Sequence, residues 1–182
     1  MKYDWYVINP AYNQEELEVL RQSIVKNFNK DYVDVPADNV TKTATVDMLY
    51  YGDIKEQLNK FKNLFLDVNK NIFGFDIHEL NDFIQLNYTT YSSEKKGEYN
   101  WHCDAVKNEP RDLKLTAILN VSEEEYEGGD FCLFLNGEIP ISNFRTPGSM
   151  IIFPGFVQHR VTPVTKGERK SLTMFVSGPN WK

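Results

Sequence analysis

Hydrophobic positions in the first part of the chain recur at helical spacing. After a short apolar strand expected at residues 5–8, an apolar side chain returns every three or four positions at Leu17, Leu20, Ile24 and Phe28. Residues that far apart lie on one face of a helix. The pattern therefore predicts a helix over about 14–27 that buries this face against a core.

The same spacing marks a second helix. Its apolar positions are Ile54, Leu58, Phe61, Leu64, Phe65, Val68 and Ile72. Asp53 and Glu56 form a capping-box pattern at its start, and Gly74 is placed to end it. Between the two helices the polar stretch 29–49 is broken by Pro36, so we expect a long loop there. This loop and the polar stretch 92–97 are the two candidate lids over the site.

After Gly74 the apolar pattern changes to the shorter period and run length of β-strands. Expected strands cover 83–90, 99–104, 113–121, 131–135, 149–153, 157–163 and 171–177. Gly128-Gly129 and Pro147-Gly148 supply turns between them. Short strands separated by turn signals are typical of an antiparallel sandwich or barrel. We expect a mainly β fold with the two helices on one outer face, and the pattern leaves the strand order open.

Composition narrows the class of protein. The chain has 182 residues, which is the length of one domain. Its net charge of −6 argues against a nucleic-acid partner, because such a partner needs a basic footprint. Cys103 and Cys132 are too few for a disulfide framework. No stretch has the apolar length of a signal peptide or a membrane span, so we expect a soluble cytoplasmic protein without a membrane partner.

His102, Asp104 and His159 are candidate metal ligands. Residues two apart on a strand point to the same face, so the imidazole of His102 and the carboxylate of Asp104 would project together. His159 lies in or beside a later strand with apolar neighbours. Taken alone, the first two are more often surface residues of a turn, and the third is more often a packed or capping histidine.

Arg169 and Ser171 are candidate ligand-binding residues that share a strand face beyond His159. Taken alone, the charged run around Arg169 is more often a solvated turn. Together with two histidines and one carboxylate, however, it completes a recognisable set. That metal arrangement is used by non-haem Fe(II) oxygenases and leaves positions for O₂ and an organic ligand. The planar guanidinium of an arginine suits the far carboxylate of a ligand such as 2-oxoglutarate.

In this order the motifs resemble those of the Fe(II)/2-oxoglutarate oxygenases of the prolyl 4-hydroxylase type, including the PKHD-type hydroxylases. The resemblance runs over about 83–178. It rests on Tyr91, on the run from Gly97 to Asp104, on Leu119-Asn120, on Tyr126-Glu127-Gly128-Gly129-Asp130-Phe131, on Pro147-Gly148 before Met150-Ile151-Ile152-Phe153-Pro154, and on the run from His159 to Arg169. It implies a double-stranded β-helix (jelly-roll) core with two or more N-terminal helices packed on the major sheet. It also implies one oxygenase domain over 1–182, with a helical support region at 1–80 and a catalytic core at 81–182.

The resemblance also implies roles for individual residues. His102, Asp104 and His159 would ligate iron, and Arg169 would hold the far carboxylate of 2-oxoglutarate. Tyr91 matches a tyrosine that often contacts this co-substrate. Some relatives carry a second tyrosine on the strand before Leu119-Asn120, where this chain has Thr116-Ala117-Ile118. We expect Ser171 or Thr116 to supply a hydroxyl in its place.

The implied activity is that of a 2-oxoglutarate-dependent dioxygenase. It would hydroxylate a C–H bond with Fe(II), O₂ and 2-oxoglutarate, release succinate and CO₂, and use ascorbate as a further cofactor. A prolyl or other protein side chain is the expected substrate, with a small molecule as the alternative. Two other classes stay open, a non-catalytic jelly-roll binding module and a cupin-type metalloprotein that does not use 2-oxoglutarate. The sequence does not set the oligomeric state.

Overall fold

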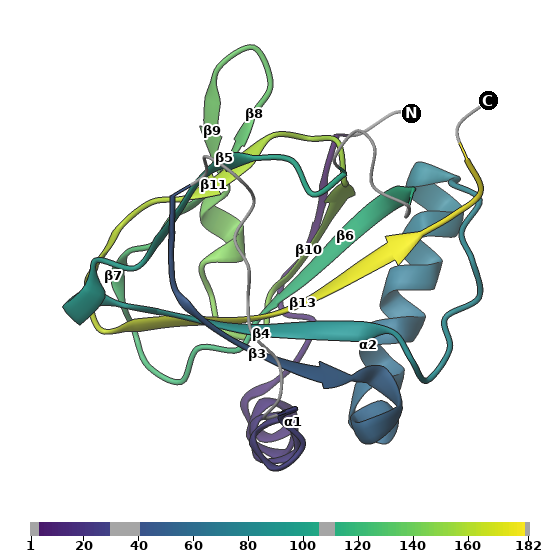
Figure 1. The fold of residues 1–182 in the computed structure, drawn as a ribbon, viewed down its shortest axis with the longest axis horizontal. Coiled ribbons are helices and arrows are strands. Elements are labelled where there is room, and N and C mark those ends of the chain that lie inside the picture. The colour runs from purple at the N-terminus through teal and green to yellow at the C-terminus, as the bar shows by residue number, and fades with distance from the viewer. Residues whose placement is uncertain (1–3, 30–40, 106–111, 181–182) are drawn as a thin grey trace.

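The strands form two facing antiparallel sheets and a small ribbon (Figure 1). The computed structural model describes residues 4–29, 41–105 and 112–180, and the strands named here belong to those segments. The larger sheet has the order β1 (Tyr6–Ile8), β10 (Met150–Pro154), β6 (Leu113–Asn120), β13 (Glu168–Ser177), β4 (Gln85–Ser92) and β3 (Thr45–Tyr50). The smaller sheet has the order β2 (Lys42–Thr43), β5 (Glu98–His102), β11 (His159–Val161), β8 (Phe131–Phe134) and β9 (Glu138–Pro140). The ribbon pairs β12 (Val164–Lys166) with β7 (Glu127–Gly128), and the predicted mainly β, jelly-roll class is confirmed.

Helix α1 (Gln14–Lys26) forms where the apolar spacing predicts it. It begins with a capping box, in which Asn13 and Glu16 exchange backbone-to-side-chain hydrogen bonds of 2.8 and 2.9 Å. Leu17, Leu20 and Ile24 are fully buried, which agrees with the predicted apolar face. The helix therefore packs its predicted face onto the larger sheet.

Helix α2 (Lys55–Val68) follows a 3₁₀ turn (Tyr51–Ile54) and continues into a π-helical turn (Asn69–Phe73). Gly74 ends it in the left-handed region at φ 72°, as predicted. The predicted capping box of Asp53 and Glu56 is wrong, because Asp53 lies in the 3₁₀ turn that precedes the helix. There its carboxylate accepts a hydrogen bond of 3.2 Å from the backbone N–H of Tyr50.

The predicted long loop at 29–49 is wrong over the part that the structure describes. Residues 30–40 lie outside the described residues, but β2 and β3 occupy 42–43 and 45–50. β3 pairs with β4 in register from Thr45, opposite Thr90, to Tyr50, opposite Gln85. The first 80 residues therefore supply strands to both sheets as well as the helical support that the sequence predicts.

Two hydrophobic clusters form the core. One lies between the helices and the larger sheet and includes Phe61 and Phe65 of α2, both fully buried. The other lies between the two sheets and joins Phe153 of β10 to Phe131 of β8. The candidate functional residues lie in this second layer, beside the aromatic packing. In the described segments, no helix has the length and apolar content that crossing a bilayer requires.

Candidate metal centre

Strand pairing brings His102 and His159 side by side. His102 ends β5, and His159 begins the neighbouring antiparallel strand β11 directly opposite it. Asp104 follows in a bend two residues later, so the expected strand over 99–104 ends before it. The two side chains nevertheless project toward the same point, as the sequence predicts.

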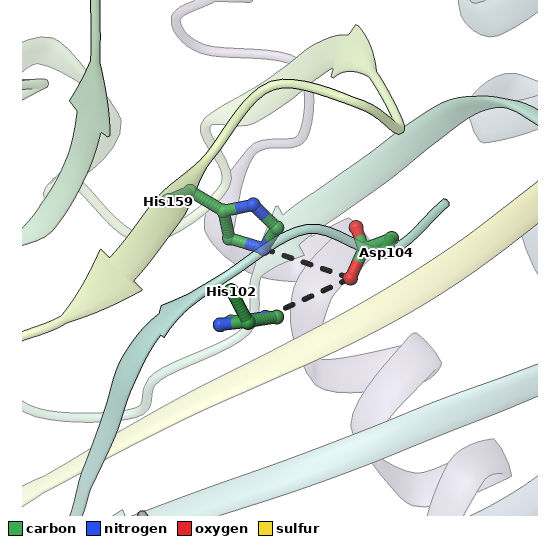
Figure 2. A group of neighbouring side chains, drawn as sticks. All are labelled: His102, Asp104 and His159. Carbon is green, nitrogen blue, oxygen red and sulfur yellow. Dashed lines mark ion pairs between the residues drawn. The ribbon is translucent and has the colours of Figure 1, made fainter. Parts of the chain in front are cut away.

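The three side chains form one compact cluster, and Figure 2 shows the carboxylate of Asp104 facing both imidazoles from one side. Their candidate ligand atoms all lie within 4.8 Å of one another. Oδ1 of Asp104 is 3.7 Å from Nε2 of His102 and 3.7 Å from Nε2 of His159. These separations are too long for hydrogen bonds but short enough for the three atoms to share one ion. Both histidines are less than 10% exposed.

Backbone contacts orient both imidazoles toward this point. Nδ1 of His102 lies 2.7 Å from the carbonyl oxygen of Asn100, and Nδ1 of His159 lies 3.0 Å from that of Val157. A carbonyl oxygen only accepts hydrogen bonds, so each Nδ1 must carry the proton when the ring is neutral. Each Nε2 is then left with a lone pair that faces the cluster, which is the state a metal ligand needs.

Burial sets the charge state of the cluster. It lowers the pKa of His159 to about 4, with a backbone hydrogen bond opposing. Burial also lowers the pKa of His102 to about 4, and the nearby His159 adds to this effect. Burial raises the pKa of the Asp104 carboxyl. A divalent cation would offset the cost of a buried carboxylate flanked by two neutral imidazoles, so the donors present fit a metal ion.

Thr116 holds the carboxylate from the opposite sheet. Its hydroxyl on β6 donates a hydrogen bond of 2.6 Å to Oδ2 of Asp104, which leaves Oδ1 facing the two histidines. Thr116 is fully buried. The sequence predicts that the hydroxyl of Ser171 or Thr116 contacts the co-substrate. In the structure the hydroxyl of Thr116 bonds to Asp104 instead.

A β-bulge adds Tyr99 to the cluster. His102 lies opposite His159 and Tyr99 lies opposite Val161, so β5 has one residue more than β11 between these pairs. In a regular strand, residues three apart face opposite sides, but the extra residue turns both rings inward. The ring of Tyr99 stacks on His102 with centroids 3.5 Å apart and planes at 17°. Nothing in the sequence marks this bulge.

Arg169 lies on β13 and is almost completely buried, at 2% exposure of the residue. Its strand neighbour Tyr91 lies opposite it on β4, and the guanidinium carbon is 5.3 Å from the centre of that ring. Nη1 donates a hydrogen bond of 3.4 Å to the hydroxyl of Ser171, so the predicted shared face is confirmed. Among the described residues, no carboxylate forms an ion pair with Arg169, whose buried charge therefore suits an anionic ligand.

One cavity connects the two halves of the site. Its lining includes His102, Asp104 and His159 together with Arg169, and the co-substrate candidates Tyr91 and Ser171 also face it. The structure thus brings the three predicted metal ligands and Arg169, Tyr91 and Ser171 to one cavity, whereas Thr116 is not among its lining residues. The lining also contains Tyr99 and Lys42, which the sequence analysis did not predict as site residues.

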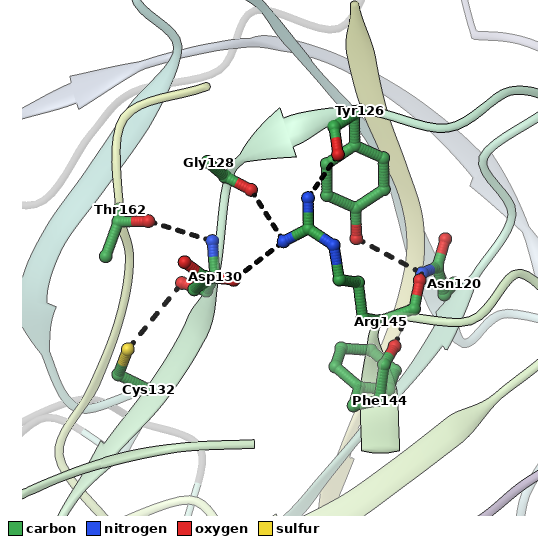
Figure 3. Close-up of polar contacts among 8 residues, drawn as sticks. All are labelled: Asn120, Tyr126, Gly128, Asp130, Cys132, Phe144, Arg145 and Thr162. Atoms are coloured by element: carbon green, nitrogen blue, oxygen red, sulfur yellow. Dashed lines mark hydrogen bonds and ion pairs between the residues drawn. The ribbon is translucent and has the colours of Figure 1, made fainter. Parts of the chain in front are cut away.

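A polar network around Arg145 holds the turn at Gly128 and Asp130 (Figure 3). Arg145 donates to the backbone oxygen of Gly128 at 3.0 Å and to the carboxylate of Asp130 at 2.7 Å, and it also contacts the backbone oxygen of Tyr126. These bonds hold the turn through Gly129, whose φ of 62° is in the left-handed region. A methyl group at Gly129 would lie 3.2 Å from Cδ of Arg169, so the glycine leaves room for that side chain.

The sequence of the chain is similar to that of known oxygenases. The 2OG-Fe(II) oxygenase superfamily matches residues 86–177, just over half of the 182-residue chain. A PKHD-type hydroxylase of Synechococcus sp. is 39% identical over 82 residues, which cover 43% of this chain and 36% of that protein. A PKHD-type hydroxylase of Nitrosomonas europaea is 26% identical over 179 residues, which cover 93% of this chain and 76% of that protein. The first match thus spans only about a third of the relative's length.

A solved structure extends the likeness over the whole fold. The crystal structure of a Pseudomonas putida prolyl-4-hydroxylase superposes with a TM-score of 0.70 and 18% sequence identity. The superposition covers 98% of this chain and 94% of that one, so it includes the N-terminal helices and both sheets. At this identity the likeness establishes a shared fold.

Proposed function

Because the chain belongs to the 2OG-Fe(II) oxygenase superfamily, we propose that it is a 2-oxoglutarate-dependent dioxygenase that hydroxylates a C–H bond. The observation that carries the proposal is one cavity with two chemically different halves. The cluster of His102, Asp104 and His159 forms the first half, and the buried cation of Arg169 forms the second. A binding module would have no need for both.

In this proposal His102, Asp104 and His159 hold Fe(II). Two imidazole nitrogens and one carboxylate oxygen are the donor set of non-haem Fe(II) oxygenases. The backbone contacts at both Nδ1 atoms support the role, because they keep each Nε2 unprotonated and aimed at the shared point. The bond from Thr116 supports it further, since it fixes which oxygen of Asp104 faces the ion.

Arg169 binds the far carboxylate of 2-oxoglutarate, and Ser171 and Tyr91 complete its surroundings. The guanidinium can donate two parallel hydrogen bonds to a carboxylate. The hydroxyl of Ser171 lies 3.4 Å from Nη1, where it can hold the same anion. Tyr91 is 5% exposed and packs beside the guanidinium, so it limits the positions that the bound acid can take.

Bound Fe(II), 2-oxoglutarate and O₂ would together supply the oxidising chemistry, with succinate and CO₂ as co-products. The chain contributes positioning and exclusion of water. Phe131 and Phe153 pack against His159, with ring centroids 5.5 and 4.8 Å away, and Tyr99 covers His102. These rings fix the two imidazoles and keep bulk water from their outer faces.

The test is succinate release by the full chain, loaded anaerobically with Fe(II) and 2-oxoglutarate and then given O₂, with and without ascorbate. We expect slow succinate formation even without the true substrate, and we expect Asp104→Ala to abolish it. Asp67→Ala is the matched control, because Asp67 is an exposed aspartate on α2 that contacts Asn71. Full activity in Asp104→Ala would remove this residue from the metal site.

The same samples separate the two rival classes. Before O₂ is added, 2-oxoglutarate should produce an absorption band on the Fe(II) protein, and Arg169→Met should require much more of it. A protein that binds Fe(II) but gives neither band nor succinate would behave as a cupin-type metalloprotein. A protein that binds no metal at all would be a jelly-roll binding module.

We further propose that the substrate is a prolyl or other side chain of a protein. Support comes from the Pseudomonas putida fold relative, which is described as a prolyl-4-hydroxylase. Proline-containing peptides and matched peptides with alanine at the same position should be compared as stimulators of succinate release. A gain of one oxygen in the mass of the proline peptide alone would support a prolyl substrate, and no stimulation by any peptide would favour a small molecule.

A further inference from the structure

Lys42 enters the cavity from the opposite sheet to Arg169. It lies on β2, the edge strand of the smaller sheet, directly opposite Tyr99 on β5. Paired residues of an antiparallel ladder face the same side of the sheet. The bulge that turns Tyr99 inward therefore turns Lys42 inward with it, and Lys42 is among the residues that line the cavity.

The ammonium group of Lys42 lies close to the metal cluster. Its Nζ is 5.1 Å from the centre of the Tyr99 ring, and that ring stacks directly on His102. Lys42 is thus positioned at the metal end of the cavity, whereas Arg169 lies on the larger sheet beside Tyr91.

The charged side chains of the lining are unevenly distributed. Of the described residues that line the cavity, Lys42 and Arg169 are cations and Asp104 is the single carboxylate. A lining of this kind attracts anions, and it offers them two separate binding groups. A dicarboxylate that reaches from the metal to Arg169 pairs its far carboxylate with Arg169, which is one of these two cations.

We propose that Lys42 is a second anion-binding residue of this cavity and holds a carboxylate at the metal end that Arg169 does not reach. The inference rests on the proposed function for the identity of the metal and the co-substrate. The carboxylate has two possible sources. It is either the keto-acid end of 2-oxoglutarate or an acidic group of the substrate next to the C–H bond that reacts.

Calorimetric titration of the Mn(II)-loaded full chain tests whether Lys42 holds the keto-acid end of 2-oxoglutarate. The ligands are 2-oxoglutarate and 2-oxovalerate, which keeps the keto acid but lacks the far carboxylate. If Lys42 holds the keto-acid end, Lys42→Met should lower the affinity for both ligands about tenfold, as expected for a lost charge-assisted hydrogen bond. Lys42→Arg should restore most of the affinity, because it returns the positive charge.

Trifluoroacetate, a minimal carboxylate, probes the second source. Its fluorine relaxation is measured in the presence of Mn(II) protein saturated with 2-oxoglutarate. The fluorine nuclei relax faster when the carboxylate is bound near the paramagnetic Mn(II) ion. If Lys42 holds a substrate carboxylate, Lys42→Met should abolish this enhancement and leave the affinity for 2-oxoglutarate unchanged. Lys62→Met is the matched control, since Lys62 also lies over a tyrosine ring, that of Tyr51 at 5.8 Å, but is not among the cavity-lining residues.

The outcomes separate this inference from the proposed function. If wild-type Mn(II) protein does not bind 2-oxoglutarate, the proposed function fails, while trifluoroacetate measured without 2-oxoglutarate still reports on Lys42 at the metal. If wild type binds 2-oxoglutarate and Lys42→Met changes neither titration nor relaxation, the inference is overturned and the oxygenase assignment is unaffected. An equal loss of affinity or of relaxation enhancement in Lys62→Met would also overturn the inference, because removal of any nearby positive charge would then have the same effect.

Discussion

The ring of Tyr99 lies flat on the imidazole of His102, with centroids 3.5 Å apart. The contact exists because β5 contains one residue more than β11 between the pair His102–His159 and the pair Tyr99–Val161. Bulges often re-aim side chains next to functional sites. Here the bulge covers one face of a proposed metal ligand with an aromatic ring and brings Lys42 to the same side.

We predict that Tyr99→Ala weakens metal binding although Tyr99 is not a proposed ligand. Without the stacked ring, the imidazole of His102 gains freedom to turn away from the cluster. Loss of such an outer contact typically lowers metal affinity about tenfold or more. Titration with Mn(II) should show this loss in Tyr99→Ala and little change in Tyr99→Phe, which keeps the ring. Equal affinities in all three proteins would mean that the stack does not position His102.

Thr116→Val should also weaken the metal site. The change keeps the shape of the side chain but removes the hydrogen bond of 2.6 Å to Asp104. The carboxylate can then rotate, and one of its oxygens is left buried without a partner. We expect Mn(II) affinity to fall by about tenfold or more and to recover in Thr116→Ser, which keeps the hydroxyl. If Thr116→Ser binds as weakly as Thr116→Val, the methyl group matters more than the hydrogen bond.

The sequence predicts the site well where local spacing determines it. His102 and Asp104 are two residues apart, and Arg169 and Ser171 share one face of β13, so spacing along the chain predicts that the members of each pair project to one side. The helix at 14–27 and its buried face follow from periodicity in the same way. Each of these predictions uses only spacing within one segment of the chain.

The remainder depends on pairings between distant segments. β3 lies in the polar stretch predicted as a loop, and its strand form depends on hydrogen bonding to β4. The inward positions of Tyr99 and Lys42 depend on a bulge that only the register with β11 defines. Thr116 meets Asp104 only because the two sheets face one another. Single-sequence patterns carry no information on which strands become neighbours.

In the metal-free protein, His102 and His159 should remain neutral well below the ordinary histidine pKa of 6.5, since burial lowers both values to about 4. A lowered folded-state pKa means that the unfolded chain binds more protons below pH 6.5. These two groups therefore disfavour the folded state progressively as the pH falls from 6.5 toward 4. The raised pKa of Asp104 opposes this trend, so stability alone is an ambiguous readout.

Imidazole NMR measures the two groups directly. The chain has three histidines, so the spectrum is simple, and His102→Gln and His159→Gln assign two of the signals. We expect both signals to show neutral rings at about pH 5.5, where an ordinary imidazole is mostly charged. Titration of either ring near the ordinary value would show that the cluster is more hydrated than its burial indicates.

Gly129→Ala should weaken 2-oxoglutarate binding while metal binding stays intact. The added methyl group would lie 3.2 Å from Cδ of Arg169 and 2.9 Å from Val164, so the arginine must shift from its place on β13. A bidentate contact tolerates little displacement, and we expect the dissociation constant for 2-oxoglutarate to rise about tenfold. Mn(II) affinity should not change, because neither contact involves His102, Asp104 or His159.

Gly74→Ala separates this effect from backbone strain. Gly74 has a φ of 72°, close to the 62° of Gly129, but a methyl group there meets no atom within 4 Å. Both variants should lose roughly 1–2 kcal/mol of stability from the left-handed backbone, and thermal unfolding should show a larger shift for Gly129→Ala, because its methyl group also meets Val164. Only Gly129→Ala should lose affinity for 2-oxoglutarate. Parallel losses in both variants would trace the effect to strain, and the turn through Gly129 would then have no part in positioning Arg169.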